Sequence, residues 1–440
     1  MNEQPKLGYW TCVALVVGNV IGVGIFLLPA SLAPYGMNAL IGWLIVAVGC
    51  LALAGVFSQL ARAMPAADGP YGYIRQTLGE LPAYMALWAY WVSVWLANAA
   101  IAAGVVGYLG IVFPQLAAIR PDLLALVLLW AMVLVNLFGL RSGGRTQVVT
   151  TVLKLLPMLA IALVGAWILL TAPATYVAHL PRTPVTLHSV MAASTIALFA
   201  MLGIESASVP AARVANPGRT IPRATLVGTT VTALIYIIVS GVPLLLIPQQ
   251  TLGTAEAPFA LVMNRFGIAG SGRWLALFVV ISGVGCLNGW TLLIGQLTRT
   301  MASNGLLPSV LGRSNRHGTP ITALVVTGLL ASVMIWMSYN KSLVDAFTFI
   351  TLAVTAANLP LYLGCSLALL VLWRRTVGTR GALTAGLIGL AGTAYAVFAF
   401  LGVGREPSIL AAALIVAGLP LYAILRLRNK SKLRCQTKAN

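Results

Sequence analysis

The chain has 440 residues, of which 60% are hydrophobic and only 8% are charged. A soluble globular domain carries about a quarter of its residues as charged side chains, so this balance excludes the ordinary soluble classes and indicates a membrane protein. The formal net charge of +19 comes from 27 Lys and Arg against 8 Asp and Glu. Because these cations fall in alternate loops rather than on one soluble face, they do not indicate binding to nucleic acid.

Apolar stretches of about 20 residues, the length that crosses the hydrocarbon core as a helix, recur along the chain. We predict an all-α membrane protein with twelve transmembrane helices in a single domain covering residues 1–440. The first span is too long for a cleaved signal peptide, so we expect the chain to be inserted intact. The predicted spans are residues 10–33, 38–61, 82–112, 122–140, 148–171, 188–212, 225–247, 274–301, 320–338, 343–372, 382–402 and 408–425.

The basic residues predict the orientation of these spans. With the N-terminus inside, 20 of the 27 Lys and Arg lie on the cytoplasmic side, six lie on the outer side, and Lys154 lies within a span. The positive-inside rule therefore predicts a multi-pass protein of the cell inner membrane with both termini in the cytoplasm. The basic tail from Arg426 to Lys438 is most simply an orientation signal that lies on anionic lipid.

The cysteines and histidines do not form a recognisable site. The five cysteines have no framework spacing, which indicates free thiols that pack as small apolar residues. His179, His188 and His317 fall at loops or span ends without the spacing of a metal site. We therefore expect neither a metal ion nor a cofactor.

The first span contains the segment "GNVIGVGIF", residues 18–26, with three glycines inside an otherwise apolar helix. Each costs roughly 1 kcal/mol relative to alanine in a helix interior. One interpretation is close helix packing, since Gly18 and Gly22 have the small-xxx-small spacing. The other is that the helix unwinds here, which a membrane protein tolerates only where the freed backbone groups face protein or a cavity.

The sixth span favours the second interpretation. It carries "LGIESASV", in which Gly203 precedes the ionisable Glu205, a residue that is expensive at membrane depth unless it faces a cavity or a partner. Interruptions at corresponding positions of two halves indicate a transporter built from inverted repeats, with its substrate at the midplane. Since the two interrupted spans are five apart, an odd number, the second repeat enters the membrane with opposite polarity.

Such a pair of breaks offers two kinds of unpaired backbone group. The N-terminus of the half-helix after a break presents N–H groups and the positive end of the helix dipole, which suit a carboxylate. The C-terminus of the half-helix before a break presents carbonyls, which suit an ammonium. The polarity therefore indicates a zwitterion such as an α-amino acid.

Five segments together resemble the amino acid-polyamine-organocation (APC) superfamily of transporters, most closely the bacterial arginine/agmatine antiporter and its basic amino acid and polyamine relatives. They are "GNVIGVGIFLLPASLA", "LGIESASV", "NPGRTIPRA", "GWTLLIGQ" from Gly289 and "NGLLP" at Asn304. The resemblance implies the fold of the leucine transporter, with a 5+5 inverted repeat and broken helices 1 and 6. The repeats would cover about residues 10–171 and 188–372, and peripheral helices about residues 382–425.

The resemblance also implies a set of site residues. The carboxylate-binding segment corresponds to Ile21, Gly22, Val23 and Gly24, and the ammonium-binding carbonyls to Val20, Phe199 and Leu202. The side-chain pocket corresponds to Ser93, Asn98, Ile101 and Trp290, with Tyr90 and Glu205 near the inner gate. Ala200 of the sixth span completes the twelve predicted substrate-binding residues.

This chain departs from the antiporter's motifs at three positions. Val23 replaces the serine of Gly-Ser-Gly, and Phe199 and Ala200 replace the Trp-Ser of the sixth span. The loss of hydroxyls favours a neutral amino acid, because an apolar pocket suits a guanidinium poorly. The cationic alternative stays open, since Trp290 can hold a cation by cation-π stacking and Asn98 can accept a hydrogen bond.

Two ionisable residues inside spans each have two interpretations. Lys154 either ties span 5 to the unwound carbonyls of span 1, or its protonation couples to opening in place of the Na⁺ of sodium-driven relatives. The resemblance favours the second role, so we predict no Na⁺ requirement. Glu205 also has two interpretations. It is a carboxylate that gates or senses protons, or it is a structural carboxylate that accepts hydrogen bonds from the N–H groups freed where the helix breaks. Asp345 lies near a span end and is expected to be an interfacial cap.

The resulting prediction is a Na⁺-independent secondary transporter of an L-amino acid that works by alternating access, as an exchanger or with protons. The alternative is a cationic amino acid/polyamine antiporter of the arginine/agmatine type. A channel would need a continuous polar lining, and an enzyme would need a nucleophile-base pair or a metal cluster at membrane depth; neither pattern is present in the sequence. We expect membrane lipid as a further partner, and both a monomer and a homodimer fit the sequence.

Overall fold

A computed structural model of the chain describes residues 8–65, 67, 69–138, 144–207, 214, 216–314, 319–338, 340–375 and 381–427. Its regular elements are helices, and each of the twelve predicted spans contains one or two of them. The spans of the first half contain α1 (Tyr9–Val20), α2 (Gly24–Leu32), α3 (Met37–Ala63), α5 (Glu80–Val112), α6 (Pro121–Leu137) and α7 (Gly144–Thr171). Those of the second half contain α9 (Leu187–Leu198), α10 (Pro217–Leu246), α13 (Ser271–Ser303), α14 (Ile321–Met337), α15 (Leu343–Arg375), α16 (Ala382–Leu401) and α17 (Arg405–Val416).

Short helices occupy several connections between these elements. They are α4 (Gly69–Leu78), α8 (Ala174–Ala178), α11 (Gln249–Gly253) and α12 (Pro258–Phe266). Turns of 3₁₀ helix are η1 (Ala33–Tyr35), η2 (Pro114–Ala118), η3 (Phe199–Met201), η4 (Ile204–Ala207) and η6 (Ser309–Gly312).

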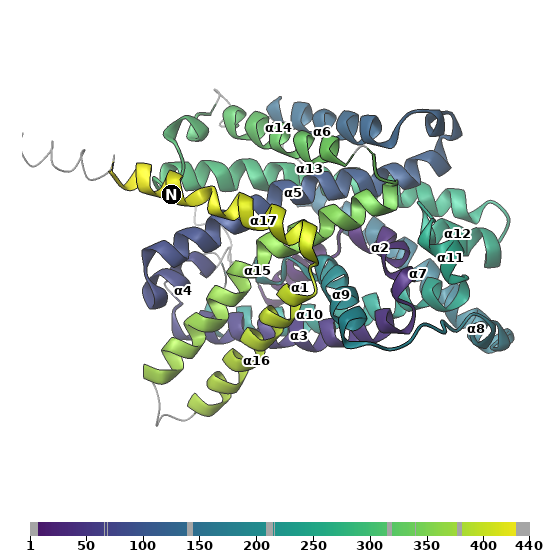
Figure 1. Ribbon diagram of the computed structural model, residues 1–440, viewed down its shortest axis with the longest axis horizontal. Coiled ribbons are helices and arrows are strands. Elements are labelled where there is room, and N and C mark those ends of the chain that lie inside the picture. Colours follow the sequence, from purple (N-terminus) through teal and green to yellow (C-terminus); the bar gives the residue numbers. More distant parts are fainter. Residues whose placement is uncertain are drawn as a thin grey trace, which may run out of the picture.

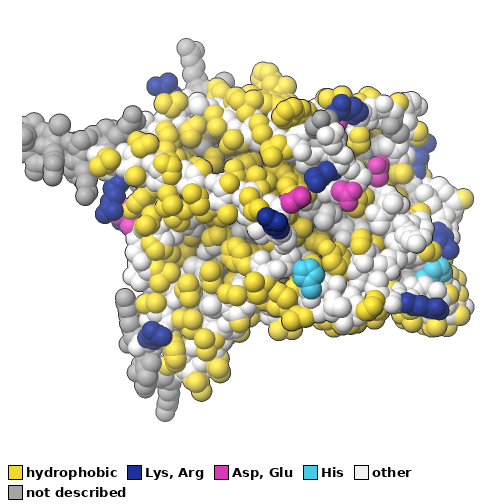
Figure 2. All heavy atoms as spheres, in the orientation of Figure 1, with side chains coloured by type: hydrophobic (Ala, Val, Ile, Leu, Met, Phe, Trp, Pro, Cys, Tyr) yellow, Lys and Arg dark blue, Asp and Glu magenta, His cyan; other side chains and the backbone are white. Residues whose placement is uncertain are grey.

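The helices have the apolar surface of a membrane protein. In the described ranges, eight helices are long and apolar enough to cross a membrane, and further apolar helices are shorter, among them the two halves of the first span. Figure 2 shows hydrophobic side chains over the left and centre of the viewed face, with Lys and Arg at its left margin and over its right part. A lipid-facing belt between polar ends accounts for this distribution.

Helix α5 lies at the centre of the bundle. It packs against α13 and α15, and the three helices run through the middle of Figure 1. Most of the 33 residues of α5 are buried. Its sequence is apolar around the whole circumference of the helix rather than amphipathic, which is typical of a helix in the interior of a bundle. On the other side, α3 packs against α10 and against α9, the helix with which the interrupted sixth span begins.

The first span is interrupted, as the glycine cluster predicts. Helix α1 ends at Val20, Ile21 has extended backbone (φ −70°, ψ 94°), and α2 begins at Gly24. A Cβ atom at Gly24 would lie 2.5 Å from a ring carbon of Phe199. Glycine is therefore needed here because the broken sixth span packs directly on the backbone.

The sixth span is interrupted as well. Helix α9 ends at Leu198 and continues as the turn η3, after which Leu202 is extended (ψ 144°) and Gly203 has φ +102°. That φ value favours glycine, because a side chain at positive φ clashes with the backbone. The chain resumes in η4, which contains Glu205.

Two predicted boundaries are wrong in a way that affects the site. The seventh span begins at Pro217 rather than near residue 225, because Pro217 is well suited to the first turn of a helix. Helix α7 begins at Gly144 rather than near residue 148. Lys154 consequently lies ten residues into its helix, about 15 Å at 1.5 Å per residue, and so deeper than the predicted boundary implied.

Candidate functional site

A cavity lies where the two interruptions meet. Residues of the first break, of the sixth-span break and of α5, α13 and α15 enclose it. The cavity has a volume of about 40 Å³, which is enough for a few water molecules. The lining residues are Val20, Gly22, Val23, Gly24, Ile25, Ser93, Ala97, Ile101, Phe199, Ala200, Leu202, Trp290, Val354 and Asn358.

The structure brings together ten of the twelve residues that the sequence analysis assigned to substrate binding. Ile21 and Asn98 are the exceptions: both are buried but neither lines the cavity. Ile21 belongs to the extended segment between α1 and α2, and its side chain is fully buried in the protein core. Asn98 follows Ala97 on α5, about 100° further around the helix axis, and it is buried beside the cavity wall without being part of it.

The backbone at the first break has the polarity that a zwitterion requires. No side chain caps α2 at Val23, and its first amides precede the regular hydrogen bonds of the helix; of these, the Phe26 amide donates to the Val23 carbonyl at 3.0 Å. These amides form the positive pole of the cavity. The carbonyls at the end of α1 form the negative pole.

Side chains from two other helices bind carbonyls of this negative pole. The Tyr236 hydroxyl on α10 donates to the Val20 carbonyl at 2.9 Å, and the Lys154 Nζ on α7 donates to the Gly18 carbonyl at 3.4 Å. Both side chains are buried. The structure therefore places Lys154 against the end of α1, which is the contact that both interpretations of this residue share.

Of the predicted carbonyls in the sixth span, that of Phe199 already accepts the Leu202 amide at 3.3 Å. It keeps its second lone pair for a ligand.

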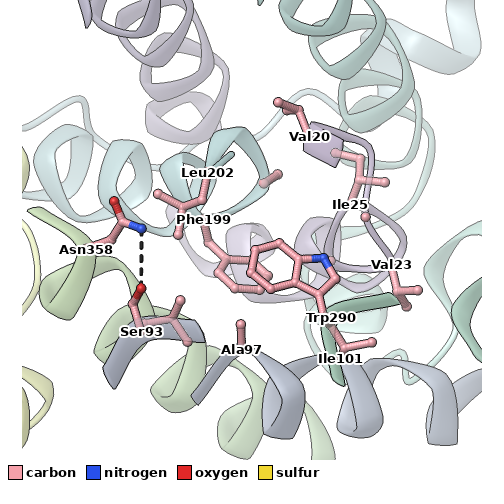
Figure 3. A pocket seen from close by; sticks show the side chains of 14 residues that line it. Val20, Val23, Ile25, Ser93, Ala97, Ile101, Phe199, Leu202, Trp290 and Asn358 are labelled. Atoms are coloured by element: carbon pink, nitrogen blue, oxygen red, sulfur yellow. Dashed lines mark hydrogen bonds between the residues drawn. The ribbon is translucent and has the colours of Figure 1, made fainter. Parts of the chain in front are cut away.

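Polar side-chain atoms are few in the cavity wall. They belong to Ser93, Asn358 and the indole of Trp290, and none of the described lining residues carries a carboxylate. The Asn358 Nδ2 donates to Ser93 Oγ at 3.3 Å, and Ser93 Oγ donates to the Tyr90 carbonyl at 2.7 Å. Figure 3 shows this pair at the left of the cavity and Val23 and Ile25 at the right, with the rings of Phe199 and Trp290 between them.

Aromatic rings cover the middle of the cavity. Phe199 packs on the backbone of Gly24 and makes an edge-to-face contact with Phe347, with ring centroids 6.0 Å apart. Trp290 of α13 also lines the cavity, and its ring overlaps that of Phe199 in the view of Figure 3. A cation near the face of Trp290 gains cation-π attraction.

Glu205 lies in a second polar cluster just beyond the sixth-span break. Its carboxylate accepts a hydrogen bond from the Tyr362 hydroxyl at 2.9 Å and interacts with the Tyr90 hydroxyl and the Gly203 backbone. Glu205 is 3% exposed, so it is a buried, multiply hydrogen-bonded carboxylate. The cluster joins η4 to α5 and α15.

Six residues of the site were not predicted from the sequence. Four line the cavity, namely Ile25, Ala97, Val354 and Asn358, and two hold it together, namely Tyr236 and Tyr362. Ala97 could have been found, because Ser93 and Ile101 lie four residues on either side and share its helix face. The residues of α10 and α15 carry no local signal, because their role depends on packing against distant segments.

Comparison with known proteins agrees with this architecture. The amino acid permease family model matches residues 7–425. The chain belongs to the amino acid permease family. It is thus a multi-pass membrane protein of the APC superfamily, as the motifs of the first and sixth spans predict, and its helices are those of a permease.

Several curated relatives match this permease over most of its length. The cadaverine/lysine antiporter of Escherichia coli is 32% identical over 380 residues, which cover 83% of each chain. The putrescine transporter PotE of Escherichia coli is 28% identical over 433 residues, which cover 98% of each chain. The putrescine transporter PotE of Haemophilus influenzae is 27% identical over 425 residues, which cover 96% of this chain and 98% of the relative.

A solved structure supports the fold. The crystal structure of a manganese transporter from Eremococcus coleocola superposes with a TM-score of 0.51 over 95% of both chains, at 15% sequence identity. This likeness shows that the two chains share a helical fold.

Proposed function

We propose that this permease is a Na⁺-independent antiporter that exchanges a cationic amino acid for a diamine. The substrate binds where two broken helices expose their backbone poles, and the observation that carries the proposal is the cavity at that point. The named relatives act on lysine, cadaverine and putrescine, which favours the cationic alternative. The preference for a neutral amino acid, drawn from the missing hydroxyls, is accordingly withdrawn.

The cavity offers a cation several sources of negative potential without a carboxylate in its wall. The C-terminal ends of α1 and α9 both point toward the breaks, and each presents the negative end of a helix dipole. The Trp290 face adds cation-π attraction, and Glu205 is buried directly beyond Leu202 and Gly203. An ammonium is therefore favoured although the lining is largely apolar.

We propose that the fold is that of the leucine transporter, with twelve spans and inverted repeats at about residues 10–171 and 188–372. The two interruptions, five spans apart, support this assignment. In it, Lys154 and the cluster of Glu205, Tyr90 and Tyr362 control opening, because each contacts a broken segment.

Counterflow in liposomes tests the function. The purified full-length chain is reconstituted, the vesicles are loaded with cadaverine, putrescine, agmatine, lysine or leucine, and uptake of labelled lysine or arginine is followed with and without a pH gradient. We expect saturable uptake that internal diamine accelerates and that choline in place of Na⁺ leaves unchanged. Non-saturable flux that is independent of the internal compound would indicate a channel and refute the proposal. Acceleration by internal leucine alone would restore the neutral substrate.

A further inference from the structure

The polar pair formed by Asn358 on α15 and Ser93 on α5 stands out in a cavity that is otherwise apolar. The Asn358 side chain is 3% exposed and lines the cavity. One of its two polar atoms, Nδ2, donates to Ser93 Oγ, whereas Oδ1 has no hydrogen-bond partner among the described residues. Buried polar groups are nearly always paired, so an unpaired amide oxygen in a binding cavity requires an explanation.

The orientation of this amide follows from its neighbours. The hydroxyl hydrogen of Ser93 is donated to the Tyr90 carbonyl at 2.7 Å. Ser93 Oγ can therefore only accept a hydrogen bond from Asn358, which requires that the NH₂ of the amide faces Ser93. The remaining atom, Oδ1, is left as an acceptor, and the group that completes it must be a donor.

The position of the pair shows which part of a ligand would meet it. In Figure 3 the pair lies at the end of the cavity opposite Val23 and Ile25 of the first break, and the rings of Phe199 and Trp290 lie between. A ligand whose α-amino and carboxylate groups bind the break therefore directs its side chain past the rings. The end of that side chain is then directed toward the pair.

We propose that Asn358 Oδ1 accepts a hydrogen bond from the distal ammonium of the substrate and thereby selects amines over apolar side chains of the same length. Ser93 is a positioning residue, because its hydrogen bond to Nδ2 fixes the orientation of the amide and leaves Oδ1 as the free acceptor. This inference rests on the proposed exchange of cationic substrates. A site with a buried acceptor discriminates strongly, because an analogue without the donor leaves that acceptor unpaired.

The test compares ligands that differ only in the distal ammonium. Exchange of labelled lysine in proteoliposomes is inhibited with lysine or norleucine, and with cadaverine or pentylamine, and the ratio of the half-inhibitory concentrations is measured. We expect Asn358→Leu to reduce the preference for the amine about tenfold or more. Asn358→Asp keeps an acceptor at the position of Oδ1 and should keep or increase the preference. Leu367→Ala, on the lipid-facing side of the same helix, is the matched control and should change nothing.

The outcomes separate this inference from the proposed function. A wild-type protein that does not prefer lysine to norleucine would refute both. A wild-type preference that persists unchanged in Asn358→Leu would refute the role of Asn358 alone. If Asn358→Leu does not reach the membrane, Asn358→Asp and Ser93→Ala decide: loss of the preference in the aspartate variant, or full preference in Ser93→Ala, contradicts the proposal.

Discussion

Replacing Lys154 by methionine separates the structural interpretation of this residue from the functional one. The ammonium is buried on α7 and donates to the Gly18 carbonyl at the end of α1. Methionine has a similar length and no charge, so the variant removes the ammonium and leaves little cavity. If Lys154 only ties the two helices together, the substitution should act on stability; if it couples protonation to opening, it should act on transport.

The distance in the structure sets the size of the stability effect. A hydrogen bond to a charged group contributes about 1.5–3 kcal/mol at ordinary geometry. The 3.4 Å separation of Lys154 Nζ and Gly18 O exceeds the usual N–H···O range, so we assign about 1 kcal/mol to this contact. Burying an ammonium costs several kcal/mol, and methionine does not incur that cost. Lys154→Met should therefore fold at least about as well as the wild type.

Transport should respond much more strongly. We expect counterflow of labelled lysine to fall at least about tenfold in Lys154→Met, a change of about 1.4 kcal/mol in the barrier, with the dependence of the rate on pH flattened. Thermal unfolding in detergent gives the stability, and proteoliposome exchange from pH 5 to 9 gives the transport. The lipid-facing Leu163→Met on the same helix is the control. A variant with the wild-type rate and pH profile would show that Lys154 has no part in the mechanism.

Three further predictions concern the gate, the second break and the driving ion. Tyr362→Phe removes the hydroxyl that donates to Glu205 at 2.9 Å and should slow exchange about tenfold. The control is Tyr84→Phe, which should not slow exchange, because the buried Tyr84 hydroxyl has no partner among the described residues. Equal exchange rates in the two variants would exclude a gating cluster. Gly203→Ala forces a side chain to φ +102° and should cost about 1–3 kcal/mol of unfolding free energy. Gly79→Ala has the same strain at φ +99° in a loop, so only the first variant should also lose transport, and loss in both would point to folding. Exchange should proceed equally in Na⁺ and in choline, and a Na⁺ requirement would contradict the role given to Lys154.

The positions of the two breaks could be predicted because their signals are local. Glycine at Gly22, Gly24 and Gly203 is unfavourable in a helix, and a carboxylate at Glu205 is unfavourable in lipid, so the sequence there conflicts with an uninterrupted span. The helix face of Ser93 and Ile101 follows from spacing in the same way. The helix starts at Gly144 and Pro217 were placed too late, because hydropathy falls at the membrane surface before the helix ends.

The sequence by itself determined that this chain is a helical membrane protein, that its first and sixth spans break, and that a dipolar ligand suits the exposed backbone. These properties depend on composition, on glycine and on helix polarity, all of which act over a few residues. Only the tertiary structure decided that Tyr236 and Lys154 bind the carbonyls of α1. It also decided that Asn358 pairs with Ser93 and that its buried Oδ1 has no hydrogen-bond partner among the described residues. Those contacts join residues more than 100 positions apart in the chain, and their partners are chosen by how the helices pack, which no local pattern records.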